Sequence, residues 1–204
     1  MTKPEFSGFK GRFFAWFLTS PLRRILDHKM GKPDERFLEL LELKGDEVVV
    51  DAGCGSGYHT LMMAERLRSG RVIGVDVSKE MLARLTGNAK KRGLADRIEV
   101  LEADGLALPL DDGFVDRAVS IAVWHHLDDP QKACSELARV LRPGGILVSI
   151  DLQIGDGHEP GKHLQGHDKR FGPQDMEEIL RTAGVKDLKI ETLGKWIIGV
   201  GRKG

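Results

Sequence analysis

The stretch VVVDAGCGSGY, Val48–Tyr58, passes from a β-branched run through an acid into glycines at every second position, Gly53, Gly55 and Gly57. The apolar run predicts a strand, and the spacing of leucine and alanine after the glycines predicts a helix over Tyr58–Leu67. Glycines at such a turn let the backbone approach a ligand closely, because no Cβ atom intervenes. The stretch therefore predicts the ligand-binding turn of an α/β fold.

Strand-like and helix-like patterns alternate along the chain, which predicts a parallel sheet with helices on both faces and right-handed crossovers. Ser78 and Asp129 suit the N-caps of two helices, and Pro130 suits the first turn of the second. The last helix is predicted over Gln174–Ala183. The predicted strands are Val48–Asp51, Val72–Val75, Ile98–Leu101, Val115–Val123 and Ile146–Ile150, followed by Leu188–Leu193 and Trp196–Val200 on either side of a turn at Gly194-Lys195.

Composition limits the function classes. The chain has 204 residues, and 31 Lys plus Arg balance 31 Asp plus Glu, so no overall positive charge would attract nucleic acid. Cys54 and Cys134 are the two cysteines, too few for a disulfide scaffold or a four-ligand zinc site, which indicates a reducing, cytoplasmic location. No segment has the length of an apolar membrane-spanning helix.

Acids also close the second and third predicted strands. Asp76 follows the glycine turn by about 20 residues, where a carboxylate can accept hydrogen bonds from the two hydroxyls of a ribose. Asp104 follows the third strand and could accept from an adenine amine. A nicotinamide cofactor would use Asp76 equally well, but Tyr58 stands where the dinucleotide fingerprint has its third glycine, so an adenosyl ligand without a pyrophosphate is favoured.

Five motifs in this order resemble the class I S-adenosylmethionine-dependent methyltransferases, in particular the small type 11 and ubiquinone/menaquinone-biosynthesis group. They are VVVDAGCGSGY, VIGVDVS (Val72–Ser78), EADGLALPL (Glu102–Leu110), FVDRAVSIAVWHHLDD (Phe114–Asp129) and LRPGG (Leu141–Gly145). The resemblance implies a three-layer α-β-α Rossmann-like methyltransferase fold, with a mostly parallel seven-stranded sheet whose last strand is antiparallel. It also implies S-adenosyl-L-methionine as cofactor and S-adenosyl-L-homocysteine as product.

The same resemblance assigns roles at the cofactor site. Asp51, Gly53 and Gly55 would hold the methionine part, Asp76 the ribose and Asp104 the adenine amine. The side chains or backbone around the adenine would come from Val77, Gly105 and Ile121. Cys54, Gly57, Tyr58 and Met81 complete the predicted cofactor set.

Histidines follow the fourth predicted strand, close to the expected position of the methyl group. The sulfonium methyl is already activated, so the protein has to align the acceptor and, for a hydroxyl or carbon acceptor, remove a proton. His126 is our first candidate for this base and His125 the second. Packing beneath the next helix is the alternative role for either, and Trp124 beside them is a candidate substrate contact.

Two further segments are predicted to serve the acceptor. Residues 1–32 are predicted to form a helical lid over a 33–204 methyltransferase domain, with Phe13 and Trp16 contacting the substrate. Aromatic side chains beside cations would also suit peripheral contact with a membrane surface. In the Gly- and His-rich segment 155–172, His163 and His167 are predicted substrate contacts, and no metal site is predicted because their spacing fits none.

The sequence thus favours methyl transfer to a small-molecule acceptor, apolar or lipid-like, by in-line displacement. A protein or nucleic-acid methyltransferase is the main alternative. A nicotinamide-dependent dehydrogenase and a cofactor-binding module without activity are weaker ones. The protein is expected to be a monomer or a homodimer, and the sequence does not identify the acceptor.

Overall fold

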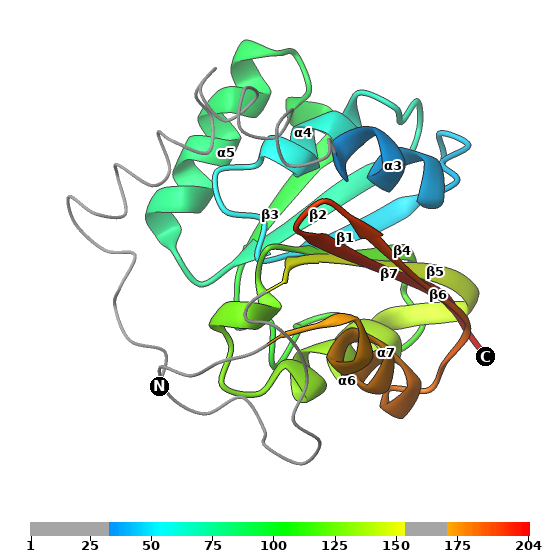
Figure 1. Cartoon of the computed structure of the whole chain (residues 1–204). Coiled ribbons are helices and arrows are strands. Elements are labelled where there is room, and N and C mark those ends of the chain that lie inside the picture. Colours follow the sequence, from blue (N-terminus) through cyan, green and yellow to red (C-terminus); the bar gives the residue numbers. More distant parts are fainter. Residues whose placement is uncertain (1–32, 154–170) are drawn as a thin grey trace.

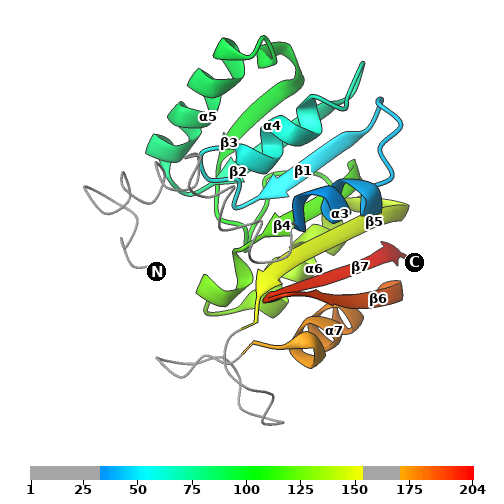
Figure 2. The same ribbon diagram turned by 45° about the horizontal axis from the view of Figure 1, so that its top comes forward.

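A computed structural model describes residues 33–153 and 171–204, and these form three layers around one sheet (Figures 1 and 2). The strands are β1 (Val48–Ala52), β2 (Arg71–Asp76), β3 (Ile98–Glu102), β4 (Val115–Ile121), β5 (Leu141–Leu152), β6 (Val185–Leu193) and β7 (Trp196–Lys203). The α-helices are α3 (Pro33–Leu40), α4 (Tyr58–Ala64), α5 (Lys79–Lys91), α6 (Pro130–Val140) and α7 (Pro173–Thr182). Two 3₁₀ turns, η1 (Ala95–Arg97) and η2 (Trp124–His126), follow α5 and β4.

The strand order in the sheet is β3-β2-β1-β4-β5-β7-β6. The first five strands pair in parallel, whereas β7 lies antiparallel between β5 and β6. The hairpin at Gly194-Lys195 and the antiparallel last strand, both predicted from the sequence, are confirmed. The fold class predicted for the chain is therefore the one observed.

Two apolar cores cover the faces of the sheet. Residues of α3, α4 and α5, including Phe37, Leu61 and Leu85, pack on one face. Residues of α6 and α7, including Leu137 and Leu180, pack on the other. Successive strand residues point to opposite faces, so Val49 of β1 packs in one core, whereas Val50 and Ala52 pack in the other. A strand buried on both faces needs consecutive apolar residues, which explains the run of valines that precedes Asp51.

Helix starts follow the predicted capping chemistry. The Ser78 hydroxyl accepts a hydrogen bond from the backbone N–H of Met81 at 3.3 Å, and Asp129 accepts from that of Lys132 at 2.8 Å. Both side chains satisfy N–H groups that have no partner within the first helical turn. Local side-chain chemistry therefore fixes where α5 and α6 begin.

Several boundaries differ from the prediction: β6 begins at Val185 rather than Leu188, and α4 ends at Ala64 rather than Leu67. Strand β4 ends at Ile121 rather than Val123, because Ala122 adopts a positive φ of 57° and the chain turns into η2. Strand β5 begins at Leu141 rather than Ile146 and so includes the LRPGG motif, with a register irregularity against β4. Proline and glycine are rare inside strands, so the sequence pattern does not predict a strand over Pro143-Gly144-Gly145.

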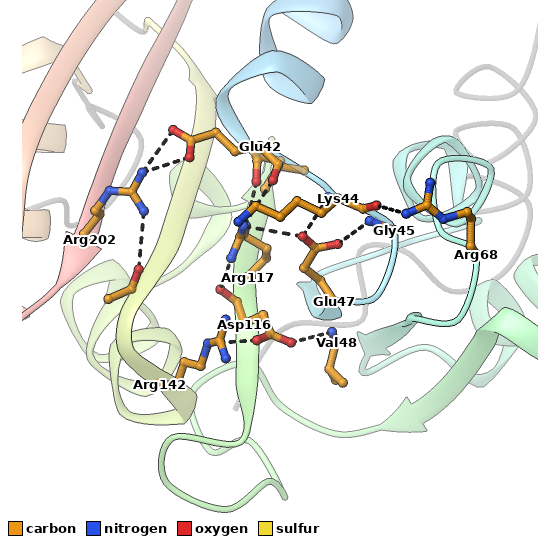
Figure 3. Close-up of polar contacts among 12 residues, drawn as sticks. Glu42, Lys44, Gly45, Glu47, Val48, Arg68, Asp116, Arg117, Arg142 and Arg202 are labelled. Carbon is orange, nitrogen blue, oxygen red and sulfur yellow. Dashed lines mark hydrogen bonds and ion pairs between the residues drawn. The ribbon is translucent and has the colours of Figure 1, made fainter.

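A buried ion network closes the amino-terminal end of the sheet (Figure 3). The Arg117 guanidinium on β4 donates to the carbonyl of Leu41 at 2.6 Å and to that of Glu42 at 3.1 Å, and lies 3.6 Å from the Glu47 carboxylate. Burial raises the pKa of Glu47, but the backbone N–H groups of Lys44 and Gly45 outweigh it and leave the pKa lowered. Arg117 thereby fastens the end of α3 to the centre of the sheet.

We expect Arg117→Met to lower the free energy of unfolding by about 3–5 kcal/mol, because it leaves a buried carboxylate and two buried carbonyls without their cation. Arg202→Met removes an exposed pair with Glu42 and should cost no more than about 1 kcal/mol. Urea titration of both variants measures the difference. Equal losses for the two would contradict the structural role of Arg117.

Candidate functional site

The glycine turn between β1 and α4 has a backbone that other residues adopt only with strain. The φ angles of Gly53, Gly55 and Gly57 are 80°, 54° and 88°. A Cβ atom on Gly53 would lie 2.4 Å from Val123, and one on Gly57 would lie 2.2 Å from Leu85. A Cβ on Gly55 would meet nothing within 4 Å, so the turn is tightly packed at its ends and open at its middle.

Asp76 ties this turn to the end of β2. One of its carboxylate oxygens accepts from the backbone N–H of Gly55 at 2.9 Å, and the other from that of Ser78 at 2.9 Å. Burial raises the pKa of Asp76, and hydrogen bonds from backbone N–H groups partly offset this. Each oxygen has further lone-pair capacity, so the carboxylate can also accept from ligand hydroxyls.

The side chains next to Asp76 suit an apolar, flat ligand. Val77 is 55% exposed, one of the two large apolar side chains that are exposed among the described residues. Asp104 is exposed at the end of β3, where the N–H of Ala103 donates to the Asp76 carbonyl at 3.2 Å. Gly105 faces open space, and Ile121 at the end of β4 is half-buried. Met81 is buried in the first turn of α5.

Asp51 lies beneath the turn rather than in it. It is 3% exposed, and its carboxylate accepts from the Thr60 hydroxyl of α4 at 2.6 Å. Burial raises its pKa to about 6, and Thr60 works in the opposite direction. The Cys54 thiol beside it is also buried, which raises its pKa. A positively charged ligand group near Asp51 would favour the ionised carboxylate.

Tyr58 points away from the turn toward α3. Its hydroxyl donates to the Asp34 carboxylate at 2.9 Å. The ring nitrogen Nε2 of His59 lies 2.9 Å from the other oxygen of Asp34. Neither Asp34 nor His59 was predicted from the sequence, because a single acid at the start of a helix has no local pattern that names its partner.

His125 meets a buried acid from the next strand. Its ring nitrogen Nδ1 contacts the carboxylate of Asp151 on β5, and its backbone N–H donates to the same carboxylate at 3.2 Å. Asp151 is 0% exposed and also accepts from the N–H of Leu152 at 2.7 Å. The sequence does carry a signal for Asp151, since it closes a buried apolar strand as Asp51 and Asp76 do.

The neighbours of His125 are placed differently. His126 is exposed, with its ring centroid 3.7 Å from that of His125. Trp124 is 0% exposed and packs in the core beneath α6 and α7. A substrate contact of Trp124 and a catalytic role of His126 stay predictions.

Several predicted residues lie outside the described residues. These are Phe13 and Trp16 of the predicted lid and His163 and His167 of the His-rich segment. Within residues 33–153 and 171–204, no three metal-ligating side chains gather at one place. In the same two ranges, no helix is both long and apolar enough to cross a membrane.

Comparison with known proteins identifies the fold family. Residues 50–149, which include the glycine turn, Asp76, Asp104 and His125, match the family model described as a methyltransferase domain. The chain carries a methyltransferase domain. This confirms the family predicted from the sequence, together with its cofactor S-adenosylmethionine.

Relatives of known name agree with this assignment. Demethylmenaquinone methyltransferase of Thermus thermophilus is 41% identical over 118 residues, which are 57% of this chain and 52% of that protein. The 27-O-demethylrifamycin SV methyltransferase of Amycolatopsis mediterranei is 32% identical over 59% of this chain and 44% of its own length. The chain thus spans about half the length of these two relatives.

A solved structure matches over nearly the whole chain. The S-adenosylmethionine-dependent methyltransferase from Aquifex aeolicus has a TM-score of 0.73 at 26% identity, covering 93% of this chain and 96% of that chain. The open space at Gly55, the exposed Val77 and the carboxylate of Asp76 fit the cofactor of this family. The residues present can therefore hold S-adenosylmethionine.

We expect Asp76→Ala to weaken binding of S-adenosylhomocysteine, because a ribose held by Asp76, as predicted, would lose charge-assisted bonds of roughly 1.5–3 kcal/mol each and Gly55 would lose its acceptor. Glu102→Ala is the control, since this exposed acid at the end of β3 pairs with Lys79 on the surface. Isothermal titration calorimetry gives both affinities. An unchanged affinity of the Asp76 variant would refute the ribose assignment.

We expect Asp51→Asn to raise Tm at pH 8 by about a few degrees, because the amide keeps an acceptor for Thr60 without burying a charge. In the wild type the raised pKa means that this contribution to stability is complete below pH 4 and is lost as pH rises through about 6. The variant should lose this part of the pH dependence. Thermal unfolding between pH 4 and 8 tests it, and a lower Tm of the variant at pH 8 would contradict it.

Proposed function

We propose that this protein is an S-adenosylmethionine-dependent methyltransferase that acts on a small-molecule acceptor through a hydroxyl or an acidic C–H group. The observation that carries the acceptor chemistry is the contact between His125 and the buried Asp151 at the carboxyl ends of β4 and β5. The names of the Thermus and Amycolatopsis relatives support a small organic acceptor over a protein or nucleic acid.

The pair can prepare a general base. A carboxylate accepts hydrogen bonds, so Nδ1 of His125 carries the proton that faces Asp151 and Nε2 carries the lone pair. Asp151 also stabilises the imidazolium that forms when Nε2 takes a proton from the acceptor. The side chain of His125 is 12% exposed, which leaves it reachable from one side while its ring is held from the other.

The same groups favour one kind of acceptor. S-adenosylmethionine supplies an activated methyl group when bound, so the remaining requirement is a nucleophile without its proton. A hydroxyl or an acidic C–H group needs a base for this, whereas a neutral amine already has a lone pair. The favoured acceptor class is therefore one that must lose a proton during transfer.

Other parts of the prediction rest on the sequence alone. Three of these predictions concern the acceptor: that residues 1–32 form a lid, that this segment contacts a membrane surface, and that the acceptor is apolar. The cytoplasmic location and a monomeric or homodimeric state also rest on the sequence alone. Each stays a prediction.

The direct test supplies the purified protein with methyl-labelled S-adenosylmethionine and an extract of its source cells. Label in the small-molecule fraction supports the proposal. Label only in acid-precipitable material would redirect it to a protein or nucleic acid acceptor. Binding of the cofactor without any transfer of label would indicate a binding module.

With the acceptor found, we expect Asp151→Asn and His125→Ala each to lower kcat by about 10²–10⁴-fold, as for loss of a general base. The affinity for S-adenosylhomocysteine should change little, because the base does not hold the cofactor. His126→Ala separates the two histidines in the same assay. A large loss in the His126 variant with near-normal kcat in the His125 variant would move the base to His126.

A further inference from the structure

The first turn of α4 is held by one acid of the neighbouring helix α3, which packs on the same face of the sheet. Asp34 uses one oxygen for the Tyr58 hydroxyl and the other for His59, both at 2.9 Å. The side chains of Asp34 and His59 are 16% and 13% exposed, so water competes weakly for these bonds. Tyr58 is the first residue of α4 and directly follows Gly57 of the cofactor turn.

Helix α3 is itself a fixed support. Phe37, one turn after Asp34, is 0% exposed and packs edge-on against the His59 ring at a centroid distance of 5.6 Å. The guanidinium of Arg36 donates to the Glu191 carboxylate of β6 at 2.6 Å and 2.8 Å. The carbonyl of Leu41, just past the end of α3, accepts from Arg117 of β4. A bond to Asp34 is therefore a bond to the body of the domain.

The cofactor turn needs such a support. Gly57 caps α4 without a side chain, and glycine loses more conformational freedom on ordering than any other residue. The bond between Asp51 and Thr60 holds the first turn of α4 from the sheet side. The bonds from Tyr58 and His59 to Asp34 hold it from the neighbouring helix α3, so the start of α4, directly after Gly57, is bonded to two carboxylates.

We propose that Asp34 is a positioning residue for the cofactor. By fixing Tyr58 and His59, it keeps the turn from Gly53 to Gly57 in the shape that receives S-adenosylmethionine, so that the cofactor does not have to order the turn when it binds. This inference rests on the proposed function. It assigns Tyr58 to the support of the turn through its hydroxyl.

The test uses the full chain and S-adenosylhomocysteine as the probe in isothermal titration calorimetry. Asp34→Ala should raise Kd about tenfold, since two charge-assisted bonds that order the turn are lost. Asp34→Asn and Tyr58→Phe, which remove less, should each raise Kd by about threefold. The matched control is Glu35→Gln, a charge loss at the next position of α3, where the side chain is exposed; its Kd should equal that of the wild type.

A positioning role separates KM from kcat. At saturating S-adenosylmethionine, Asp34→Ala should keep a kcat within about twofold of the wild type, whereas KM for the cofactor rises with Kd. The double variant Asp34→Ala/Tyr58→Phe should bind no more weakly than Asp34→Ala, because both changes break the same bond.

Two failures can be told apart. If the wild type binds S-adenosylhomocysteine and all the Asp34 and Tyr58 variants bind it equally well, the positioning role is refuted and the proposed function stands. A lower Tm of these variants with unchanged Kd would refute it in the same way. If the wild type itself does not bind, the proposed function fails first.

Discussion

The pairing of β1 with β2 on one side and β4 on the other is the constraint on which the site depends. Asp51 lies opposite Gly74 and Ala52 opposite Val75, so β1 and β2 end together. The chain therefore turns directly after Ala52. The backbone N–H groups of Gly53 and Cys54 both donate to the Val75 carbonyl, at 2.8 Å and 3.0 Å. A Cβ atom would collide with Val123 at Gly53 and with Leu85 at Gly57, and all three glycines of the turn have a positive φ, which other residues adopt only with strain.

This geometry places acids where they are costly. Burial raises the pKa values of Asp51 and Asp76, which means that the fold bears a penalty for keeping them ionised near neutral pH. Within residues 33–153 and 171–204, a hydroxyl donor holds Asp51 and backbone N–H donors hold Asp76. Acids held in this way can still accept hydrogen bonds from ligand hydroxyls and attract a cationic ligand. The fold gives up some stability to keep them buried, as proteins commonly do at functional sites.

The sequence predicted the seven strands and the helices from α4 onward, because strands with both faces buried and helices with capping side chains leave local patterns. Helix α3 was not predicted. The position of β7 between β5 and β6 came from the family resemblance, since spacing along the chain does not determine strand order. The cofactor residues follow from the same resemblance. Asp34 was missed because its partner Tyr58 lies 24 residues away in sequence and only the fold brings the two together. Asp151 closes a buried strand, which is a signal in the sequence, but nothing local pairs it with His125, 26 residues away.

The two ends of the sheet have different roles: the amino-terminal end is structural, and the carboxyl end carries the candidate site. Helix α3 connects them. At the amino-terminal end, Arg117 is buried and its contacts are with backbone carbonyls and the Glu47 carboxylate, so this network holds the fold together. At the carboxyl end, each carboxylate oxygen of Asp76 can accept a further bond, and Nε2 of His125 is the base in the proposed function. Arg117 fixes the chain just after the last turn of α3. Asp34, in the first turn of α3, holds the start of α4 next to the cofactor turn. Helix α3 thus links the rigid network at the amino-terminal end of the sheet to the glycine turn at the carboxyl end. Ordering that turn on ligand binding would otherwise cost conformational entropy, because glycine has the most backbone freedom to lose.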